Sequence, residues 1–388
     1  MNFKKLIMWL LPWFPILGMY QVSVIPLAYI VYTPLLLVFL LKPRALKIES
    51  SIKVLAIVLF IVTLIQLVLP YTNASVIIHL TLTMYLTLLY YICFTNYVRL
   101  EEFMTPYMAT SIVFMLGLLY QVFLLFARHQ LIDGPIVLFP SLLSKNNVVD
   151  VEILRPMSFF SEPQAYATWM VIFTIVMIEH NRFFLAALAT LTILLCTSTE
   201  GLVLIAFVWI MFLLFSKSNW WAKVLVIVAI IFIATQYTSL EFFEVGYNKA
   251  MNTDYEENER LFQGFALFKR LDFAGFLFGM GTAMNSFYAD YASSMGLTGD
   301  SVYMSDAIGV FVSFGVFVGI CWWVFILQKI TFKNKSLLTY SICLCIIPFA
   351  QTCFLGGGFV YLFGIYIILK RYLKEKENNS YLDESYSH

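Results

Sequence analysis

Apolar residues fill most of the chain in long runs, and short polar and charged segments separate these runs. A helix of about 20 residues crosses a hydrocarbon core of roughly 30 Å, and a shorter run fits when its ends are buried in protein. The pattern therefore predicts about twelve transmembrane helices. The predicted spans are 6–20, 23–41, 54–69, 74–94, 103–126, 163–179, 184–197, 201–215, 222–236, 303–327, 337–354 and 359–369.

The composition supports a location inside a membrane. Of the 388 residues, 61% are apolar and 12% are charged, whereas a soluble domain carries about 25% charged residues. These values exclude a water-soluble globule and a disordered chain. The 24 Lys and Arg residues against 23 Asp and Glu residues leave no basic excess, which excludes a nucleic-acid-binding protein. We expect an all-α polytopic integral membrane protein, with residues 1–388 forming a single membrane domain.

The distribution of basic residues predicts the orientation of the spans. With both termini in the cytoplasm, 17 of the 24 Lys and Arg residues fall on the cytoplasmic side and seven fall outside, as the positive-inside rule requires. The first run lacks a small-residue cleavage site, so we expect a retained span rather than a signal peptide. The polar segment 370–388 is typical of a solvated, disordered cytoplasmic tail.

Two long loops, at about 127–162 and 236–303, fall on the outer, periplasmic side of this topology. Long loops on one face of a bundle commonly carry function. The short cytoplasmic connections contain no Gly-rich phosphate-binding motif, which argues against ATP hydrolysis. No Lys or Arg lies in the middle of a span, which argues against a voltage sensor or a lysine-based proton pump. We expect the chemistry of this protein to face outward.

The first outer loop ends in the string Arg-Pro-Met-Ser-Phe-Phe-Ser-Glu-Pro at 155–163. Proline suits the first position of a helix, so Pro156 is expected to open a short helix. Arg155 and Glu162 would then lie about two turns apart on one side of that helix. This pair suits a phosphate-linked, sugar-bearing substrate, and it suits an exposed ion pair at the membrane surface equally well.

The second outer loop contains an amphipathic pattern at 254–271. Five apolar residues recur there at helical spacing, which predicts a helix lying on the outer leaflet. It would serve as a substrate-facing element or as an interfacial anchor. The Gly-rich turn at 278–281 lets the backbone approach a ligand or a neighbouring helix.

Two further acids lie at the outer ends of spans. Asp306 falls about one turn inside the membrane, where an acid must be hydrated, paired or used. A snorkelling or capping acid is the simpler role for it. Glu200 follows a tight turn between two short spans, where helix capping is the simpler role and substrate contact the alternative. No two histidines lie at the spacing of zinc ligands.

The order of these features resembles the Wzy-type O-antigen and capsular polysaccharide polymerases, which are related to the O-antigen ligases. The resemblance extends over nearly the whole chain. Its parts are the string at 155–163, the turn Thr199-Glu200-Gly201, Asn258 with Arg260, the turn at 278–281 and the span opening at 300–319.

This chain departs from the family in two places. The family often has Ser-Arg-Gly at the short turn, where this chain has Thr199-Glu200-Gly201, so an arginine contact is not carried over. Ligases usually place a histidine in the large outer loop, and no histidine lies between residues 236 and 303 here. The second departure favours a polymerase over a ligase.

The resemblance implies a GT-C-like glycosyltransferase architecture at the outer face of the bacterial cytoplasmic (inner) membrane. The donor would be a glycan growing on undecaprenyl diphosphate, and the acceptor would be the next lipid-linked repeat unit. Membrane lipid and a chain-length regulator are the other partners implied. Because the diphosphate donor is already activated, neither a metal nor another cofactor is expected.

Arginines would bind the departing diphosphate, because a guanidinium stays charged and can bind phosphate through two donors. The candidates are Arg155, Arg260 and Arg270.

A carboxylate would accept the proton of the attacking acceptor hydroxyl. Glu162 is the first candidate for the general base and Asp306 the second. Glu200 and Asn258 would contact the substrate.

Three alternatives remain open from the sequence. The first is an O-antigen ligase, and the second is a flippase for lipid-linked oligosaccharides or another secondary transporter. A transporter commonly shows paired halves with broken helices in matching positions, and no such symmetry is visible. The third is an accessory scaffold whose loops dock assembly partners.

Overall fold

The computed structural model describes residues 3–22, 25–41, 46–69, 74–130, 132, 134–143, 155–215, 223–224, 259–281 and 304–385. The predicted span at 222–236 and most of the second outer loop lie outside the described residues.

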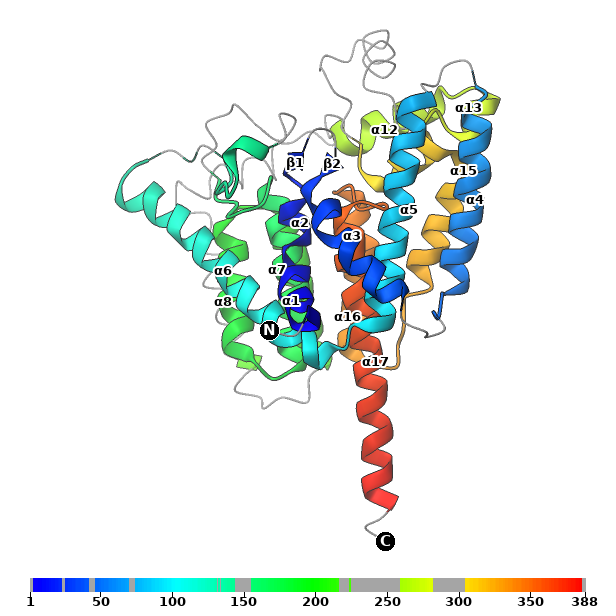
Figure 1. Ribbon diagram of the computed structural model, residues 1–388. Helices are drawn as coiled ribbons and strands as arrows, with labels where there is room; N and C mark the ends of the chain where they lie inside the picture. Colours follow the sequence, from blue (N-terminus) through cyan, green and yellow to red (C-terminus); the bar gives the residue numbers. More distant parts are fainter. Residues whose placement is uncertain are drawn as a thin grey trace.

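The described chain is mostly helical, with little sheet (Figure 1). Its α-helices are α1 (Phe3–Leu10), α2 (Phe14–Leu17), α3 (Leu27–Leu40), α4 (Ser50–Gln66), α5 (Ala74–Tyr97), α6 (Leu100–Ala127), α7 (Pro163–Glu179), α8 (Phe183–Leu195), α9 (Thr199–Phe215), α12 (Glu259–Lys269), α13 (Phe273–Phe278), α15 (Asp306–Leu327), α16 (Lys335–Ile346) and α17 (Gly357–Ser385). Short 3-10 turns are η1 (Leu11–Trp13), η2 (Pro140–Leu142) and η5 (Ile347–Phe349), and β1 (Gln21–Val22) pairs antiparallel with β2 (Ile25–Pro26).

The first predicted span is interrupted rather than continuous. Pro12 and Pro15 lie in the first turns of η1 and α2. Proline has no backbone N–H and restricts the residue before it, so the run divides into α1, η1 and α2.

Successive helices alternate in direction between two ends of the bundle. At one end, the start of α16 contacts the ends of α7 and α9, because Ser336 Oγ donates to Glu179 and Lys335 Nζ donates to the Phe215 carbonyl. At the opposite end, the starts of α7 and α9 meet. Figure 1 shows α12, α13 and the β1–β2 pair at that second end, away from the C-terminus. We call the first end the basic end and the second the outer end.

Exposed apolar side chains follow helical spacing on the outside of the bundle. On α4, the face opposite the buried Leu55, Leu59 and Val62 is both apolar and exposed, with Ile57 60% accessible. Water-soluble helices present polar residues on such a face. The exposed apolar side chains at this spacing are Val54, Ile57, Ile61 and Leu64 on α4, Val113, Leu116, Tyr120 and Phe123 on α6, and Phe317, Ile320, Val324 and Leu327 on α15.

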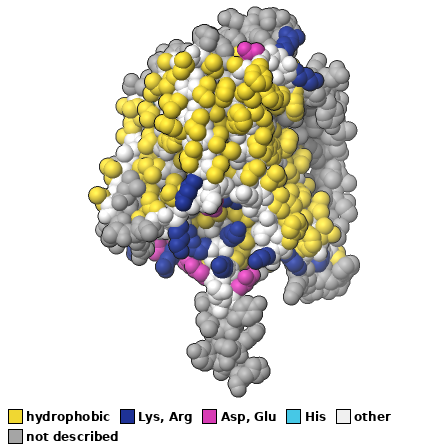
Figure 2. Space-filling model, turned by 90° about the vertical axis from the view of Figure 1, so that its right-hand side faces the viewer, with side chains coloured by type: hydrophobic (Ala, Val, Ile, Leu, Met, Phe, Trp, Pro, Cys, Tyr) yellow, Lys and Arg dark blue, Asp and Glu magenta, His cyan; other side chains and the backbone are white. Residues whose placement is uncertain are grey.

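This apolar exterior fits a hydrocarbon environment. Figure 2 shows it on one face as a broad band, with many Lys, Arg, Asp and Glu side chains beneath it and a few above it. Within the described residues, three helices are long and apolar enough to cross a membrane, and these are Ile77–Tyr97, Leu100–Ala127 and Asp306–Leu327.

Aromatic side chains fill the centre of the bundle. The rings of Trp169 on α7 and Tyr361 on α17 stack with centroids 3.4 Å apart. The hydroxyl of Tyr361 also lies 2.6 Å from the hydroxyl of Tyr107 on α6. Burying large rings with their polar atoms paired holds three helices at a fixed spacing.

Helix α15 is broken at Gly315, whose backbone has φ 76° and ψ 179°. The break frees carbonyl groups in the preceding turn, and the Gly-rich segment that follows α13 satisfies them. The N–H of Met280 donates to the Val312 carbonyl at 2.9 Å, and the N–H of Gly281 donates to the Ser313 carbonyl at 2.9 Å. The Gly-rich turn at 278–281 therefore approaches a neighbouring helix, which is one of its two predicted roles.

Glycine is required on both sides of this contact. A Cβ on Gly279 would lie 2.4 Å from backbone atoms of α15, and a Cβ on Gly315 would lie 2.2 Å from a backbone oxygen at the end of α13. Gln66 closes the contact by donating to the carbonyls of Phe278 at 2.6 Å and Ser313 at 2.8 Å. The segment after α13 and Gln66 of α4 thus satisfy the carbonyls of Val312 and Ser313 beside the break, as a membrane interior demands.

One side of α12 packs on α15, and its position on the outer leaflet stays a prediction. Leu267 is 1% exposed and clusters with Ile308 and Val312. Gly264 permits the close approach, since a Cβ there would lie 2.2 Å from the Ile308 side chain. Of the predicted stripe, Phe268 and Leu271 pack against this cluster and Phe265 is 46% exposed. The side chains of Leu261 and Phe262 lie outside the described residues.

The predicted disordered tail is also wrong over most of its length. Helix α17 continues from the bundle through residues 370–385 and protrudes from the basic end (Figure 1). Segment 370–385 contains neither glycine nor proline to end the helix.

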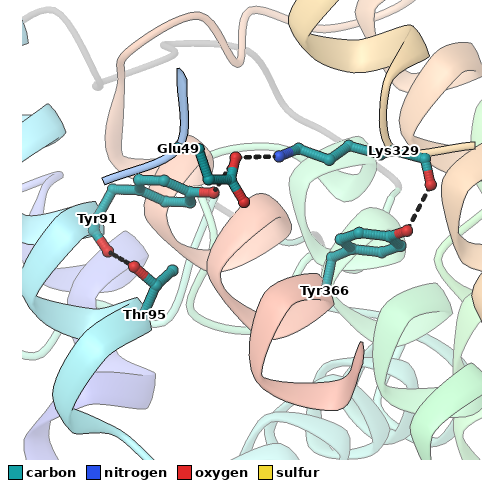
Figure 3. Close-up of polar contacts among 5 residues, drawn as sticks. All are labelled: Glu49, Tyr91, Thr95, Lys329 and Tyr366. Carbon is teal, nitrogen blue, oxygen red and sulfur yellow. Dashed lines mark hydrogen bonds and ion pairs between the residues drawn. The ribbon is translucent and has the colours of Figure 1, made fainter. Parts of the chain in front are cut away.

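At the basic end, an ion pair between the end of α15 and the start of α4 also contacts α5 and α17 (Figure 3). Lys329 follows α15 and pairs with Glu49, which precedes α4, and their side chains are 5% and 34% exposed. Tyr91 on α5 donates to the Glu49 carboxylate at 3.5 Å, and Tyr366 on α17 donates to the Lys329 carbonyl. The Lys329 ammonium also lies 4.3 Å from the Phe325 ring centroid. These contacts hold α4, α5, α15 and α17 together at the end of the bundle that the charge distribution predicts to be cytoplasmic.

Candidate functional site

The segment 155–163 approaches α7 as a series of turns, so the predicted helix after Pro156 is wrong. Ser158 has a left-handed backbone conformation, with φ 57°, which a helix cannot contain. The backbone N–H groups of Met157 and Ser158 donate to Gln121 Oε1 at 2.9 Å and 2.7 Å, and Ser158 Oγ donates to the Phe114 carbonyl at 2.7 Å. Polar groups of α6 therefore hold this segment in place of helical hydrogen bonds.

Arg155 is bound to the turn between α8 and α9. Its Nε donates to Thr197 Oγ1 at 3.2 Å, and its Nη2 donates to the Thr197 carbonyl at 2.9 Å. Thr197 adopts φ 52°, another left-handed conformation. Arg155 is half-buried, and the residue that it binds, Thr197, lies three positions before Glu200 in the chain.

Glu200 lies in the first turn of α9, but the turn is capped by another residue. Ser198 Oγ accepts the Gly201 N–H at 3.2 Å, so the predicted capping role belongs to Ser198. The Glu200 carboxylate instead accepts hydrogen bonds from two amides, Gln164 on α7 and Gln351 after η5, the second at 2.9 Å.

Asp306 opens α15 and is 7% exposed. One of its carboxylate oxygens accepts the backbone N–H groups of Cys353 and Phe354. Its own N–H donates to the Gln351 carbonyl at 3.2 Å. Of the alternatives predicted for this acid, the paired one is observed, and it ties α15 to the loop between η5 and α17.

Gln351 connects these acids. Its side chain donates to Glu200 and to Thr168, and its carbonyl accepts from Asp306. Glu162 is the residue immediately before α7, two positions before Gln164, and its side chain is half-buried. We call two hydrogen-bonded groups at this end together the outer polar cluster. They are Arg155 with Thr197, and Gln164, Thr168, Glu200 and Asp306 with Gln351.

The remaining candidates, Arg260, Arg270 and Asn258, lie in α12 or next to it in the chain. Arg270 is exposed just after the end of α12. Arg260 lies in the first turn of α12, and its side chain is outside the described residues, as is all of Asn258. Arg260 lies about one helical turn before Gly264. Gly264 packs closely against Ile308 near the start of α15.

Sequence reasoning missed the amides that organise the site. Gln164 and Gln351 each lie alone at the edge of an apolar run, and Gln121 lies within one. An isolated amide in a membrane span needs a polar partner, so this signal could have been used. The identity of the partners depends on helix packing and is not encoded locally.

The cluster combines a cation with acids at the outer end of an apolar bundle. A half-buried guanidinium suits an anion, and half-buried carboxylates suit a sugar hydroxyl or a proton. A scan against models of known protein families finds no match, and a search of curated proteins finds no significant match either. The function is therefore inferred from the residues of this site.

Proposed function

We propose that this protein is a Wzy-type polysaccharide polymerase of the bacterial cytoplasmic membrane, with about twelve spans and a GT-C-like architecture. It would transfer a glycan from undecaprenyl diphosphate to the next lipid-linked repeat unit at the outer face. The observation that carries this proposal is the outer polar cluster, in which Arg155 binds Thr197, three residues before Glu200 in the chain, at the end of the bundle opposite the basic end.

In the proposed reaction, a hydroxyl of the acceptor sugar attacks the anomeric carbon of the donor. The bond from that carbon to the diphosphate oxygen breaks, and lipid diphosphate departs with the bonding electrons. Arg155 stabilises the charge that develops on the diphosphate. Glu162 accepts the proton of the attacking hydroxyl.

The other acids act through position in this proposal. Asp306 has one oxygen engaged by two backbone N–H groups, so it is better suited to fixing the loop at 350–354 than to accepting a proton. Glu200 orients Gln164 and Gln351 around the site. Arg260 and Arg270 on α12 remain candidates for a second contact with the diphosphate.

Reconstitution with purified lipid-linked repeat units tests the proposal. A polymerase gives a ladder of products, a ligase transfers the glycan to another acceptor, a flippase changes only sidedness, and a scaffold alone gives no reaction. The variants Arg155→Ala and Glu162→Gln should lose the ladder while inserting normally. Arg128→Ala is the matched control, because Arg128 is an exposed arginine that ends α6 outside the cluster. A normal ladder from both Arg155→Ala and Glu162→Gln would contradict the assignment.

A further inference from the structure

A cavity of about 490 Å³ opens at the basic end of the bundle, far along the helices from the outer polar cluster. It lies among the ends of α7 and α9, the start of α8, the first turn of α16 and the protruding part of α17. Its volume falls within the range of about 300–1,000 Å³ that is typical of small-molecule sites.

Cations line the polar side of this cavity. The lining includes Lys333, Lys335 and Lys376, against a single described carboxylate, that of Glu179. Ser336 Oγ donates to that carboxylate, and Lys335 donates to the Phe215 carbonyl. Lys333 and Lys376 are exposed and form no ion pair with another described residue. The cavity thus presents an excess of positive charge, which favours an anion.

Apolar side chains line the other side. Ile175, Val208, Met211 and Phe212 form this wall. Beside the cavity, Phe184 at the start of α8 is 79% exposed, as a residue in contact with lipid would be. Free phosphate would contact only the lysines, whereas a phospholipid has an anionic headgroup for the lysines and acyl chains for the apolar wall.

We propose that this cavity binds the headgroup of an anionic phospholipid from the cytoplasmic leaflet. The phosphate lies against Lys333 and Lys376, and the first part of an acyl chain lies against Met211 and Phe212. Basic pockets between helices on the cytoplasmic side are suited to such headgroups. This inference rests on membrane insertion and on the described cavity, and it does not depend on the polymerase activity.

Native mass spectrometry of the purified full-length protein tests this site. Phosphatidylglycerol and phosphatidylcholine with the same acyl chains are titrated separately, and inorganic phosphate and acyl-free glycerophosphoglycerol are added as competitors. The wild type should bind phosphatidylglycerol at least tenfold more tightly than phosphatidylcholine, and neither competitor should displace it.

The double variant Lys333→Gln/Lys376→Gln should bind phosphatidylglycerol about 30-fold more weakly, since each lysine near an anionic lipid contributes about fivefold. Lys335 is left intact because it also holds the end of α9. The control double variant Lys53→Gln/Lys374→Gln removes two exposed lysines from the same end, outside the cavity lining, and should bind like the wild type. Equal binding of both lipids, unchanged binding in the first variant, or displacement by inorganic phosphate would each overturn the proposal. Binding requires no glycan substrate, so a failed polymerase assay leaves this result intact.

Discussion

Three residues other than glycine hold left-handed backbone conformations close to the outer polar cluster. These are Ser158, Thr197 and Leu355, with φ of 57°, 52° and 48°. Each such conformation costs about 1–3 kcal/mol and persists only where its surroundings impose it. Thr197 is held by Arg155, and Ser158 by polar groups of α6. Strain concentrated in the segments that present Arg155 and the acids is consistent with a site whose geometry is fixed before substrate arrives.

Gln351 is the residue on which this geometry depends most. The variant Gln351→Leu removes the donor to Glu200 and Thr168 and leaves both acceptors short of a partner. Since an unsatisfied buried group costs about 1–3 kcal/mol, we expect a lower melting temperature in detergent and loss of product formation. Gln328→Leu, which changes an exposed glutamine at the end of α15, should leave both unchanged. If the two variants melt alike, Gln351 does not hold the cluster together.

At the scale of elements, the break in α15 determines how α13 and the Gly-rich turn are seated. Gly315 has a combination of φ and ψ that is essentially restricted to glycine. The facing Gly279 has φ 72° and ψ 175°, which belongs to the same region. The two segments meet through their backbones, so no side chain can be added between them.

We therefore expect Gly315→Ala and Gly279→Ala each to destabilise the protein by about 3 kcal/mol or more, from backbone strain and steric overlap together. Folded yield after membrane extraction and the melting temperature would measure this effect. Gly356→Ala is the matched control, since a Cβ at Gly356 meets no atom within 4 Å. Equal melting temperatures for all three variants would show that the contact between α13 and α15 carries little stability.

The ion pair at the basic end makes a prediction for pH. Burial lowers the pKa of the Lys329 ammonium below its ordinary value of 10.5, and the nearby Glu49 partly opposes this shift. Between the lowered value and 10.5, the unfolded chain binds more protons than the folded one, so this residue's contribution to stability increases as the pH rises. Relative to Lys329→Met, the wild type should gain melting temperature on going from neutral pH toward 10.5.

The comparison with Lys329→Met is needed because buried tyrosines act in the opposite direction at alkaline pH. Lys370 contributes to the lowered pKa of Lys329, and Tyr91 and Tyr366 face the pair from α5 and α17. Lys370→Met should reduce the effect without abolishing it. A wild type that loses melting temperature relative to Lys329→Met over this range would show that the ammonium is better solvated than its burial indicates.

The positions of most helices could be predicted from apolar runs, because burial in lipid or protein requires such runs. Helix α7 begins and ends at the predicted residues 163 and 179. The sequence pattern could not reveal the partner of α12, since an apolar stripe looks the same whether it covers lipid or α15. The short helix at 156 was predicted from proline alone, and the amides of α6 that displace it lie more than 30 residues away in the chain.

At the scale of the whole molecule, two chemically different ends enclose an apolar middle. One end carries Lys329, the cavity lysines and the protruding α17, and the other carries the outer polar cluster. The charge asymmetry that predicts orientation can be read from sequence, because it depends on composition alone. The meeting of Arg155 with Thr197, and of Gln351 with Glu200, could not be read in this way because it joins residues 42 and 151 positions apart.

This arrangement predicts a topology that labelling can check. In a cysteine-free background, a cysteine at exposed Arg270 should react with a membrane-impermeant maleimide in intact spheroplasts. A cysteine at exposed Lys333 should react only after permeabilisation, because the basic end faces the cytoplasm under the positive-inside rule. As a control, both cysteines should react in permeabilised cells, which shows that each position is reactive when the label can reach it. The reverse pattern would place the outer polar cluster inside the cell and exclude the proposed reaction.

The continuous helix α17 has a practical consequence for handling this protein. Its residues 370–385 lie beyond the predicted span 359–369 and extend about 24 Å. This part forms a rod that projects from the bundle on the side away from Arg155. An affinity tag or fluorescent reporter fused to the C-terminus is thereby carried clear of the folded body, so it can be used for purification or imaging without obstructing access to the opposite face.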